Sequence, residues 1–434
     1  MQKIMQVPIH EGPISKSKWS LSRKYLTLLI LMASSYGYSM NWLQWGGPNG
    51  DFTTKSDALL EKWPEYGPKL LWKIPLGDGY SSILYKDGSL FTMFSEGEYE
   101  VVTSLSASTG KTIWEDRYKR EFWPDMRLAF GPGPNATPLI MDDKIISIGI
   151  AGQMRCLNLE TGQLIWKRNL PKEFGRLKRV EEYGYSNSPI RYKNLALIQV
   201  GGDKHSVIAI NPENGASIWE SVPGGVSYAQ PTVIKLAGVD QFIYFTPEGV
   251  NGLDPENGDF LWHSVIPVGN GNHLTPAVQC DENHLFISSQ FNSGGGRLLK
   301  ITQGSSGMQV EQIWFNQKMR ASCWTFIRRG EVIYGSTGGH NSSFLSAFNW
   351  KTGKFSWRKR GFHMAQSIYA DQKFIFLDTN GNLSMAKISP DSIEIIGTIN
   401  VSKKPSWTLP TLVDTQIFIR DRKNIQALSL SSAQ

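Results

Sequence analysis

The phrase LSASTGKTIW, at residues 105–114, recurs along this 434-residue chain. The other copies are LNLETGQLIW at 157–166, INPENGASIW at 210–219, LDPENGDFLW at 253–262 and FNWKTGKFSW at 348–357. Every copy ends in tryptophan, and Trp72 and Trp314 extend the series to seven tryptophans at spacings of 42 to 53 residues. A period of about 40 to 50 residues, marked by a turn glycine and a tryptophan, is typical of β-propeller blades.

Each copy carries a glycine four residues before its tryptophan, and a Thr or Asn directly before that glycine. A glycine at one fixed offset indicates a tight turn whose backbone needs a positive φ. The tryptophan then begins the outermost strand, where we expect it to dock against the next blade. We assign a structural blade motif to these pairs: Gly110 and Trp114, Gly162 and Trp166, Gly215 and Trp219, Gly258 and Trp262, Gly353 and Trp357.

Prolines mark where the inner strands begin, because each stands ahead of an alternating β-branched run. These are Pro138, Pro189, Pro231, Pro276 and Pro410. Six blades end at Trp114 to Trp357, a degenerate seventh spans about 363–396, and the last lacks its outer strand. The segment around Trp72 can supply that strand. The sequence predicts an all-β, eight-bladed β-propeller of four-stranded antiparallel blades, closed by strands from both termini, with seven blades as the alternative.

The first 39 residues do not follow this pattern. Lys16, Lys18, Arg23 and Lys24 precede the apolar stretch YLTLLILMA and then small residues. This arrangement predicts a signal peptide over residues 1–39, followed by the propeller over 40–434. An uncleaved anchor is the alternative, although the apolar stretch is short for a membrane span. We expect a periplasmic or secreted bacterial protein with no membrane span in its mature part.

The charge of the chain is unevenly distributed. The net charge is +7, and residues 1–39 contribute five Lys and Arg against one Glu, which leaves +3 for the rest. The segments that join each outer strand to the next inner strand are basic, and they share one face of a propeller. Six residues account for most of this excess: Arg176, Lys178, Arg179, Arg358, Lys359 and Arg360. They predict a face that attracts anionic partners, although solvated loops that happen to be basic would look the same.

Ligands of propellers bind at the channel mouth, where the inner strands converge. Alignment on the recurring prolines brings aromatic and polar residues into adjacent rings there. The ligand-binding candidates are Tyr80, Asn135, Tyr185, Tyr228, Gln230, His273, Trp324, Gln366 and Trp407. Aromatic faces with polar tips suit a flat or sugar-like ligand, whereas side chains that only plug the channel are the structural alternative.

Other motifs do not indicate chemistry. The carboxylates of DPENGD at 254–259 resemble a calcium loop, but NPENG stands at the same place in the preceding copy, which indicates a blade turn. The seven histidines form no zinc motif, and the three cysteines are far apart. We predict no catalytic residues, no metal site and no disulfide framework.

The repeated phrase resembles the pyrroloquinoline quinone (PQQ) repeat, and the resemblance covers nearly all of the chain after residue 41. Further stretches strengthen it, namely WGGPNGDF, GPKLLWKIPLGDGYSS, GYSNSPI and FIRDRKNIQALSL. The chain looks like the secreted PQQ-binding-like propellers named after BamB, the propeller subunit of the outer-membrane barrel-assembly machinery. The resemblance implies a non-catalytic platform for partner proteins. The related quinoprotein dehydrogenases instead bind PQQ with Ca²⁺, and they commonly contain a pair of adjacent cysteines. This chain lacks such a pair.

These observations favour an exported, non-catalytic and monomeric scaffold that binds a protein or an anionic envelope component at its channel-mouth face. A PQQ-dependent alcohol or sugar dehydrogenase, with PQQ and Ca²⁺ as cofactors, is the alternative, and a carbohydrate-binding module is a third hypothesis. A nucleic-acid partner is not expected for an exported protein.

Overall fold

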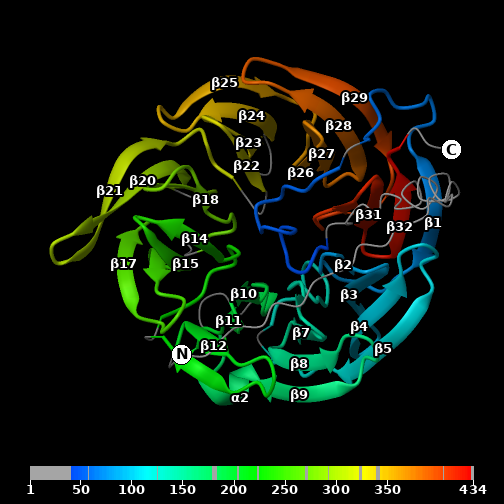
Figure 1. Cartoon of the computed structure of the whole chain (residues 1–434), viewed down its shortest axis with the longest axis horizontal. Helices are drawn as coiled ribbons and strands as arrows, with labels where there is room; N and C mark the ends of the chain where they lie inside the picture. Colours follow the sequence, from blue (N-terminus) through cyan, green and yellow to red (C-terminus); the bar gives the residue numbers. More distant parts are fainter. Residues whose placement is uncertain are drawn as a thin grey trace, which may run out of the picture. The chain divides into compact units, whose positions relative to one another are not determined.

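The computed structural model describes residues 41–431, except for 57, 125, 178–182, 203–204, 222–223, 269–271, 292, 322–324, 339–342 and 404. These residues belong to one compact unit. Its strands form eight four-stranded antiparallel sheets, arranged as blades around a channel (Figure 1). The predicted all-β, eight-bladed propeller is confirmed. Within the described residues, no helix has the length and apolarity needed to cross a membrane.

The blades follow one another in chain order, each from its innermost to its outermost strand. Blade 1 contains β2 (Leu84–Lys86), β3 (Ser89–Glu96), β4 (Tyr99–Ser106) and β5 (Thr112–Lys119). Blade 2 contains β6 (Leu139–Met141), β7 (Lys144–Ile148), β8 (Gln153–Asn158) and β9 (Leu164–Asn169), and is followed by the short helix α2 (Leu170–Phe174). Blade 3 contains β10 (Ile190–Tyr192), β11 (Leu195–Gln199), β12 (Val207–Ile210) and β13 (Ser217–Glu220). Blade 4 contains β14 (Thr232–Leu236), β15 (Val239–Thr246), β16 (Gly249–Leu253) and β17 (Phe260–Val265).

The second half of the ring repeats this order. Blade 5 contains β18 (Val278–Gln279), β19 (His284–Ser289), β20 (Gly295–Gly304) and β21 (Gly307–Asn316). Blade 6 contains β22 (Phe326–Arg329), β23 (Val332–Thr337), β24 (Phe344–Asn349) and β25 (Lys354–Lys359). Blade 7 contains β26 (Gln366–Ala370), β27 (Lys373–Leu377), β28 (Asn382–Ile388) and β29 (Ile393–Asn400). Blade 8 contains β30 (Thr411–Val413), β31 (Gln416–Arg420), β32 (Asn424–Ser429) and, as its outermost strand, β1 (Lys69–Pro75).

Strands from the two ends of the propeller close the ring. β1 pairs antiparallel with β32, from Lys69 opposite Ser429 to Pro75 opposite Asn424. Across the junction to blade 1, the buried Arg420 donates to the carbonyl oxygens of Met93 at 2.6 Å and Gly77 at 3.1 Å. The last blade is thus completed by the N-terminal strand, as the sequence predicts, so that β32 is paired on both sides.

The tryptophan ladder joins each blade to the next. The turn glycines have positive φ, for example +71° at Gly162. A Cβ placed there would lie 2.6 Å from the ring of Trp114, in the preceding blade. The indole N–H of Trp114 also donates to Leu159 O in the same turn, at 3.0 Å. The glycine therefore supplies both the turn conformation and the space for the neighbouring indole.

Two blades depart from this rule. The turn of blade 5 contains Gly304 and Gly307, but a Cβ at either would not meet Trp262. Trp262 instead donates to Gln241 Oε1 of its own blade at 2.6 Å. In blade 7 the register places Gly397 at the tryptophan position. A Cβ at Gly397 would lie 2.7 Å from the ring of Trp63, which is buried although it precedes β1. An N-terminal residue thus supplies the indole that blade 7 lacks.

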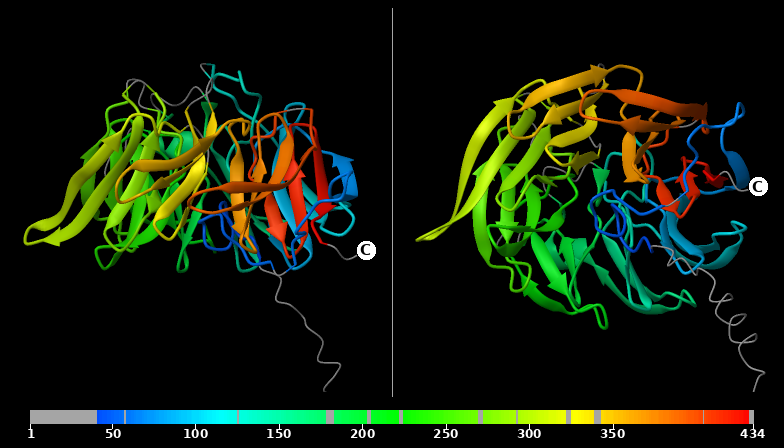
Figure 2. Two further views of the ribbon diagram at one scale, coloured as in Figure 1. Left: turned by 90° about the horizontal axis from the view of Figure 1, so that it is seen from above. Right: turned by 45° about the horizontal axis from the view of Figure 1, so that its top comes forward.

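The propeller has two distinct faces, because adjacent strands are antiparallel. One face, here the connection face, carries the segments that join each outermost strand to the next blade, such as 120–138. The opposite turn face carries the tight turns, such as 142–143 and 159–163. Figure 2 shows both in side view, with the teal loop of 120–138 projecting from the connection face and the blue N-terminal segment at the turn face.

Candidate functional site

The predicted ring residues lie where the connections of the connection face enter the inner strands. Two of them stack on each other. Tyr80, in the connection from β1 to β2, stacks on Trp407, in the connection from blade 7 to blade 8. Their ring centroids are 5.2 Å apart and their planes meet at 20°. The structure therefore brings together two residues that are far apart in sequence.

Tilted ring contacts extend this pair through two residues that sequence reasoning missed. The ring of Phe130 lies 5.3 Å from Trp407 and 5.2 Å from Tyr183. Tyr183 in turn lies 5.7 Å from the predicted Tyr228. We call these five residues the aromatic arc: Trp407, Tyr80, Phe130, Tyr183 and Tyr228.

Hydrogen bonds fix the arc. Tyr80 Oη donates to Phe130 O at 2.6 Å, and Tyr183 N donates to Tyr228 Oη at 3.2 Å. The predicted Asn135 lies beside the arc, where its Nδ2 donates to Tyr183 O and to Ser186 Oγ, both at 3.1 Å. A ligand at this face would therefore meet side chains that are already ordered, which lowers the entropy lost on binding.

One ion pair borders the arc. Arg422 donates to both carboxylate oxygens of Asp78, at 2.7 and 2.5 Å, and its guanidinium carbon lies 5.8 Å from the centroid of Tyr80. Burial raises the pKa of Tyr80 to about 12, which strengthens the preference of its hydroxyl for the neutral form.

Other predicted residues hold the blades together. Gln230 is buried, where its Oε1 accepts from Ser188 N at 2.7 Å and its Nε2 donates to Ser188 O at 2.9 Å, which joins blade 4 to the entrance of blade 3. Gln366 is also buried, and its Nε2 donates to Trp407 O at 3.4 Å. Both amides belong to the predicted rings at the channel mouth, and their hydrogen bonds are made to other residues of the protein.

Two predicted aromatic or imidazole residues lie inside the fold. His273 is fully buried, its Nδ1 is 2.7 Å from Ser289 Oγ, and burial lowers its pKa to about 4. Tyr185 is buried and donates to Val200 O at 3.2 Å, and burial raises its pKa well above the usual value. Neither side chain presents a surface to a ligand at the connection face. Trp324, the remaining ring candidate, lies outside the described residues.

The predicted anionic-partner face is described in part, since Lys178 and Arg179 lie outside the described residues. Arg176 is exposed after α2, and Arg358, Lys359 and Arg360 are exposed at the end of β25, on the other side of the ring. The guanidinium carbons of Arg358 and Arg360 lie 4.0 and 5.2 Å from the centroid of Phe344. The four cations thus share the connection face but form two separate groups.

Sequence reasoning also missed an apolar projection on this face. In the connection from blade 1 to blade 2, Phe122, Leu128 and Phe130 are 38%, 41% and 46% exposed. This loop, residues 120–135, is named the apolar loop below. The available signal was the cluster of apolar residues in REFWPDMRLAFGPGPN, a stretch rich in glycine and proline where solvent-exposed loops are normally polar.

The described residues of the arc do not fit a PQQ molecule with its calcium ion. A planar quinone needs a gap beside a flat group, but Tyr80 and Trp407 are in direct contact. Both oxygens of the neighbouring carboxylate, Asp78, are bound by Arg422, so they are not free to ligate calcium. Among the residues that the structure describes, no group of three or more His, Cys, Asp or Glu could hold a metal ion.

Comparison with solved structures places the fold among known propellers. The structure is similar to BamB from Moraxella catarrhalis, with a TM-score of 0.57 and 12% identity over 83% of this chain and 99% of that one. It is also similar to quinohemoprotein alcohol dehydrogenase ADHIIG from Pseudomonas putida HK5, with a TM-score of 0.64 and 11% identity over 91% of this chain and 81% of that one. At these identities the likeness shows the fold alone.

Comparison with curated proteins gives a partial match. Quinoprotein alcohol dehydrogenase PedH from Pseudomonas putida is 26% identical over 152 residues, which are 33% of this chain and 23% of that protein. The chain thus spans less than a quarter of that relative's length. A family model matches residues 98–359, more than half of the chain, so the chain belongs to the family described as outer membrane protein assembly factor BamB.

Proposed function

We propose that this propeller is a non-catalytic binding scaffold of the bacterial cell envelope, exported by residues 1–39, whose connection face engages a protein partner. The observation that carries the proposal is the apolar loop. Its three large side chains remain partly exposed although each is bulky enough to enter a core. Exposed aromatic and aliphatic groups on a rigid support are typical of the anchors of protein interfaces.

The surroundings of the loop support this function. Phe130 is held between Trp407 and Tyr183, so one of the three exposed side chains is fixed before a partner arrives. The exposed cations Arg176, Arg358, Lys359 and Arg360 lie on the same face. They favour a partner with acidic groups, since opposite charges steer two surfaces toward one another.

The experiment compares two sets of exposed apolar residues. In the test variant, Phe122→Ser and Leu128→Ser are combined. In the control, Ile113→Ser and Ile218→Ser change two apolar residues of the outer strands β5 and β13 that are even more exposed. Each purified chain is crosslinked in envelope extract, and its partners are quantified by mass spectrometry. We expect the loop variant to lose a specific protein by about tenfold, a change of about 1.4 kcal/mol in binding, while the control retains it. Equal recovery by both variants contradicts the proposal.

The similarity to PedH keeps a PQQ-dependent dehydrogenase as the second candidate. It is tested separately by adding PQQ and Ca²⁺ to the purified chain and following quinone absorbance and dye reduction with alcohols and aldose sugars. Dye reduction that requires PQQ would refute the non-catalytic function.

A further inference from the structure

The channel is half closed at the turn face by residues 42–54. At one end, Trp42 exchanges backbone hydrogen bonds with Tyr85 of blade 1, at 2.8 and 3.0 Å. At the other end, Tyr369 N donates to Phe52 O at 2.9 Å, and Thr54 N donates to Tyr369 O at 3.0 Å, on blade 7. The segment therefore crosses from blade 1 to blade 7, as the blue trace in Figure 1 shows, and among the described residues it leaves the side of blades 3 to 6 uncovered.

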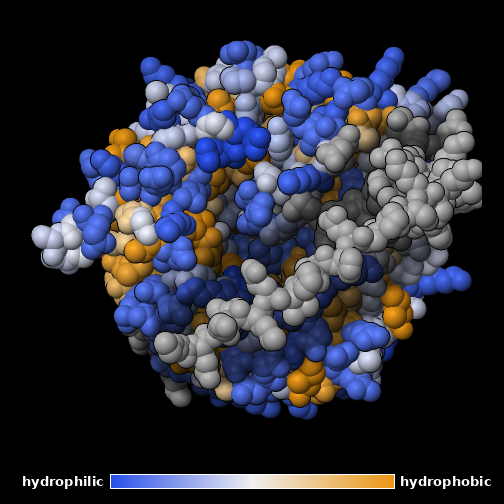
Figure 3. All heavy atoms as spheres, in the orientation of Figure 1, coloured by the Kyte–Doolittle hydropathy of each residue, from blue (hydrophilic) through white to orange (hydrophobic). Residues whose placement is uncertain are grey.

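A cavity of about 490 Å³ occupies the uncovered side. Its walls are residues of the N-terminal segment and the inner strands β10, β14, β18 and β22. Figure 3 shows the turn face, with a central hollow bordered largely by hydrophilic side chains. The volume lies within the range of pockets that hold small molecules, about 300 to 1,000 Å³.

The walls of the cavity are strongly basic. Four cations line it, namely Arg191, Lys235, Arg328 and Arg329, against a single carboxylate, that of Asp51, which gives a net formal charge of +3. Asp51 Oδ1 accepts from Thr53 N at 3.0 Å and Thr53 Oγ1 at 2.8 Å. Arg191 Nε donates to Lys193 O at 2.9 Å, and the contact of Arg191 with the Asp142 carboxylate is long, at 3.5 Å.

The other three cations have no acidic partner among the described residues, since Lys235, Arg328 and Arg329 occur in none of the ion pairs found there. Arg328 is held by two carbonyl oxygens, with Nε donating to Gln279 O and NH1 donating to Gly330 O, both at 3.0 Å. The guanidinium carbon of Arg329 lies 4.3 Å from the centroid of Tyr369. Both guanidinium groups are thus positioned by neutral groups, and their charge is left uncompensated.

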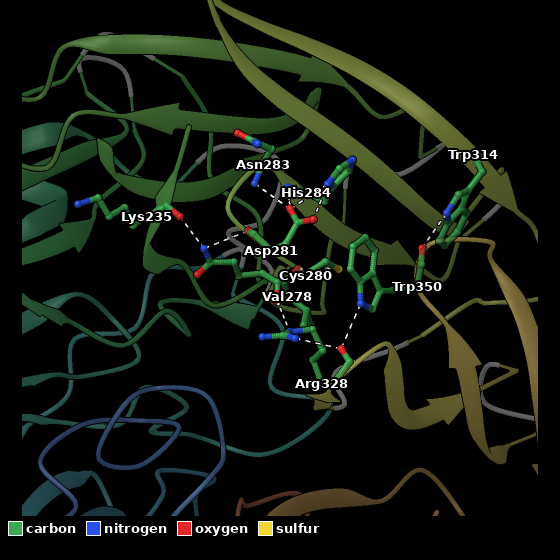
Figure 4. Close-up of polar contacts among 11 residues, drawn as sticks. Lys235, Val278, Cys280, Asp281, Asn283, His284, Trp314, Arg328 and Trp350 are labelled. Carbon is green, nitrogen blue, oxygen red and sulfur yellow. Dashed lines mark hydrogen bonds and ion pairs between the residues drawn. The ribbon is translucent and has the colours of Figure 1, made fainter. Parts of the chain in front are cut away.

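Gln279, in blade 5, connects Lys235 of blade 4 to Arg328 of blade 6. Its Nε2 donates to the backbone oxygen of Lys235 in β14 at 2.5 Å, and its own backbone oxygen accepts from Arg328 in β22. Figure 4 shows this connection, with Arg328 reaching toward β18 and the Lys235 side chain extending away from the drawn contacts. Behind Arg328, Trp350 Nε1 also donates to Gly330 O, at 3.2 Å.

We propose that this cavity binds a small organic anion that carries two or more carboxylate or phosphate groups. Positioned guanidinium groups bind such anions through paired N–H donors. Several cations around one small cavity repel one another unless an anion neutralises them. The rings of Trp45 and Phe52, in edge contact at 4.9 Å, give the cavity an apolar wall for the carbon skeleton of the ligand. This site lies on the face opposite the apolar loop and does not depend on the proposed function.

The test is calorimetric titration of the purified full chain with citrate and, separately, with inorganic pyrophosphate. We expect saturable binding of one molecule of at least one probe per chain, weakened in about 0.5 M salt. The probe with the higher affinity identifies carboxylate or phosphate as the preferred group. The combined variant Arg328→Gln and Arg329→Gln should lower the affinity about tenfold or more.

The matched control is Arg358→Gln with Arg360→Gln, because these two arginines also lie over an aromatic ring but on the connection face. It should bind the probe with the affinity of the unchanged chain. Lys235→Gln, a change of one exposed side chain, serves as a second variant should the double change prevent folding, and it too should weaken binding. Absence of saturable binding, or equal affinities in the cavity variants and the control, would overturn the proposal.

Discussion

Replacement of one turn glycine tests how the blades are joined. Gly162 has a φ of +71°, and a Cβ added there would lie 2.6 Å from two ring carbons of Trp114 in the preceding blade. Trp114 is buried and is tied to the same turn through its indole N–H. Gly162→Ala therefore combines an unfavourable backbone conformation with a steric clash that the indole has little freedom to avoid.

The two effects can be separated with a second glycine. A non-glycine residue in the left-handed region costs about 1 kcal/mol, and overpacking adds about 2 kcal/mol. Gly162→Ala should thus lower the free energy of unfolding by about 3 kcal/mol. Gly88 has a φ of +86°, but an added Cβ there meets no atom within 4 Å. Gly88→Ala should therefore cost only the backbone contribution, about 1 kcal/mol.

The measurement is urea unfolding, with the slope compared between variants so that a change in midpoint reports stability. A Trp114→Leu background provides the decisive comparison, because it removes the indole against which the new Cβ clashes. In that background Gly162→Ala should cost about as much as Gly88→Ala does in the native chain, about 1 kcal/mol. Equal costs at Gly162 and Gly88 in the native chain, or an unchanged cost at Gly162 without the indole, would refute the reasoning.

Three further changes test other parts of the fold. Trp63→Ala should lower the free energy of unfolding in urea by about 3 to 5 kcal/mol, because it removes the indole that covers Gly397. The control Tyr66→Ala changes a residue that is 90% exposed and should alter this free energy by less than about 0.5 kcal/mol. Similar losses in the two variants would contradict the role of Trp63 in packing blade 7. Arg420→Met should lower the free energy of unfolding by about 3 kcal/mol, because it removes the donors that join blade 8 to blade 1. Arg176→Met changes an exposed arginine and should leave the midpoint of urea unfolding unchanged. Glu100 is buried, which raises its pKa from 4.5 to about 7, so the folded chain binds its proton more tightly and stability falls as pH rises from about 4.5 to about 7. Glu100→Gln keeps an acceptor for Ile150 N and should remove this fall, making the variant more stable than the native chain above pH 7; parallel stability curves against pH would exclude this cause.

The repeat was sufficient to predict the blades because the interactions that define a blade are local. Gly162, Asn158 and Trp166 lie within nine residues, and Asn158 Oδ1 accepts from Thr161 N at 2.9 Å inside that one turn. The same local pattern also predicted that the strand around Trp72 completes blade 8, because the last copy of the repeat supplies only three strands. In the structure, β1 pairs with β32 as the fourth. Where the pattern is absent, local reasoning had no information.

Trp63 and the aromatic arc illustrate that limit. Trp63 occupies the indole position of blade 7, but it lies more than 300 residues from Gly397 and in no repeated phrase. Phe130 precedes Pro138 by eight residues and Tyr183 precedes Pro189 by six. Because these offsets differ, alignment on the strand-initial prolines could not place the two residues beside Tyr80 or Tyr228. The same alignment placed Gln230 correctly before its strand, yet it could not show that both ends of its amide bind Ser188.

At the turn face, the inner strands of blades 7 and 8, which the N-terminal segment covers, differ in charge from the inner strands that line the cavity. Where the segment covers the channel at blades 7 and 8, the inner strands end in the buried apolar residues Ala370 and Val413, which share a core cluster with Phe52. At blade 1, where the segment also pairs, β2 ends in Lys86. Where it leaves the channel open, the corresponding strands carry Lys235 and Arg328. Exposure to water explains why these open ends are polar, because a charge there need not be desolvated. It does not explain why they have the same sign, since a mixture of acids and bases would be solvated equally well and would avoid mutual repulsion. An anion held between them accounts for the shared sign of the charges.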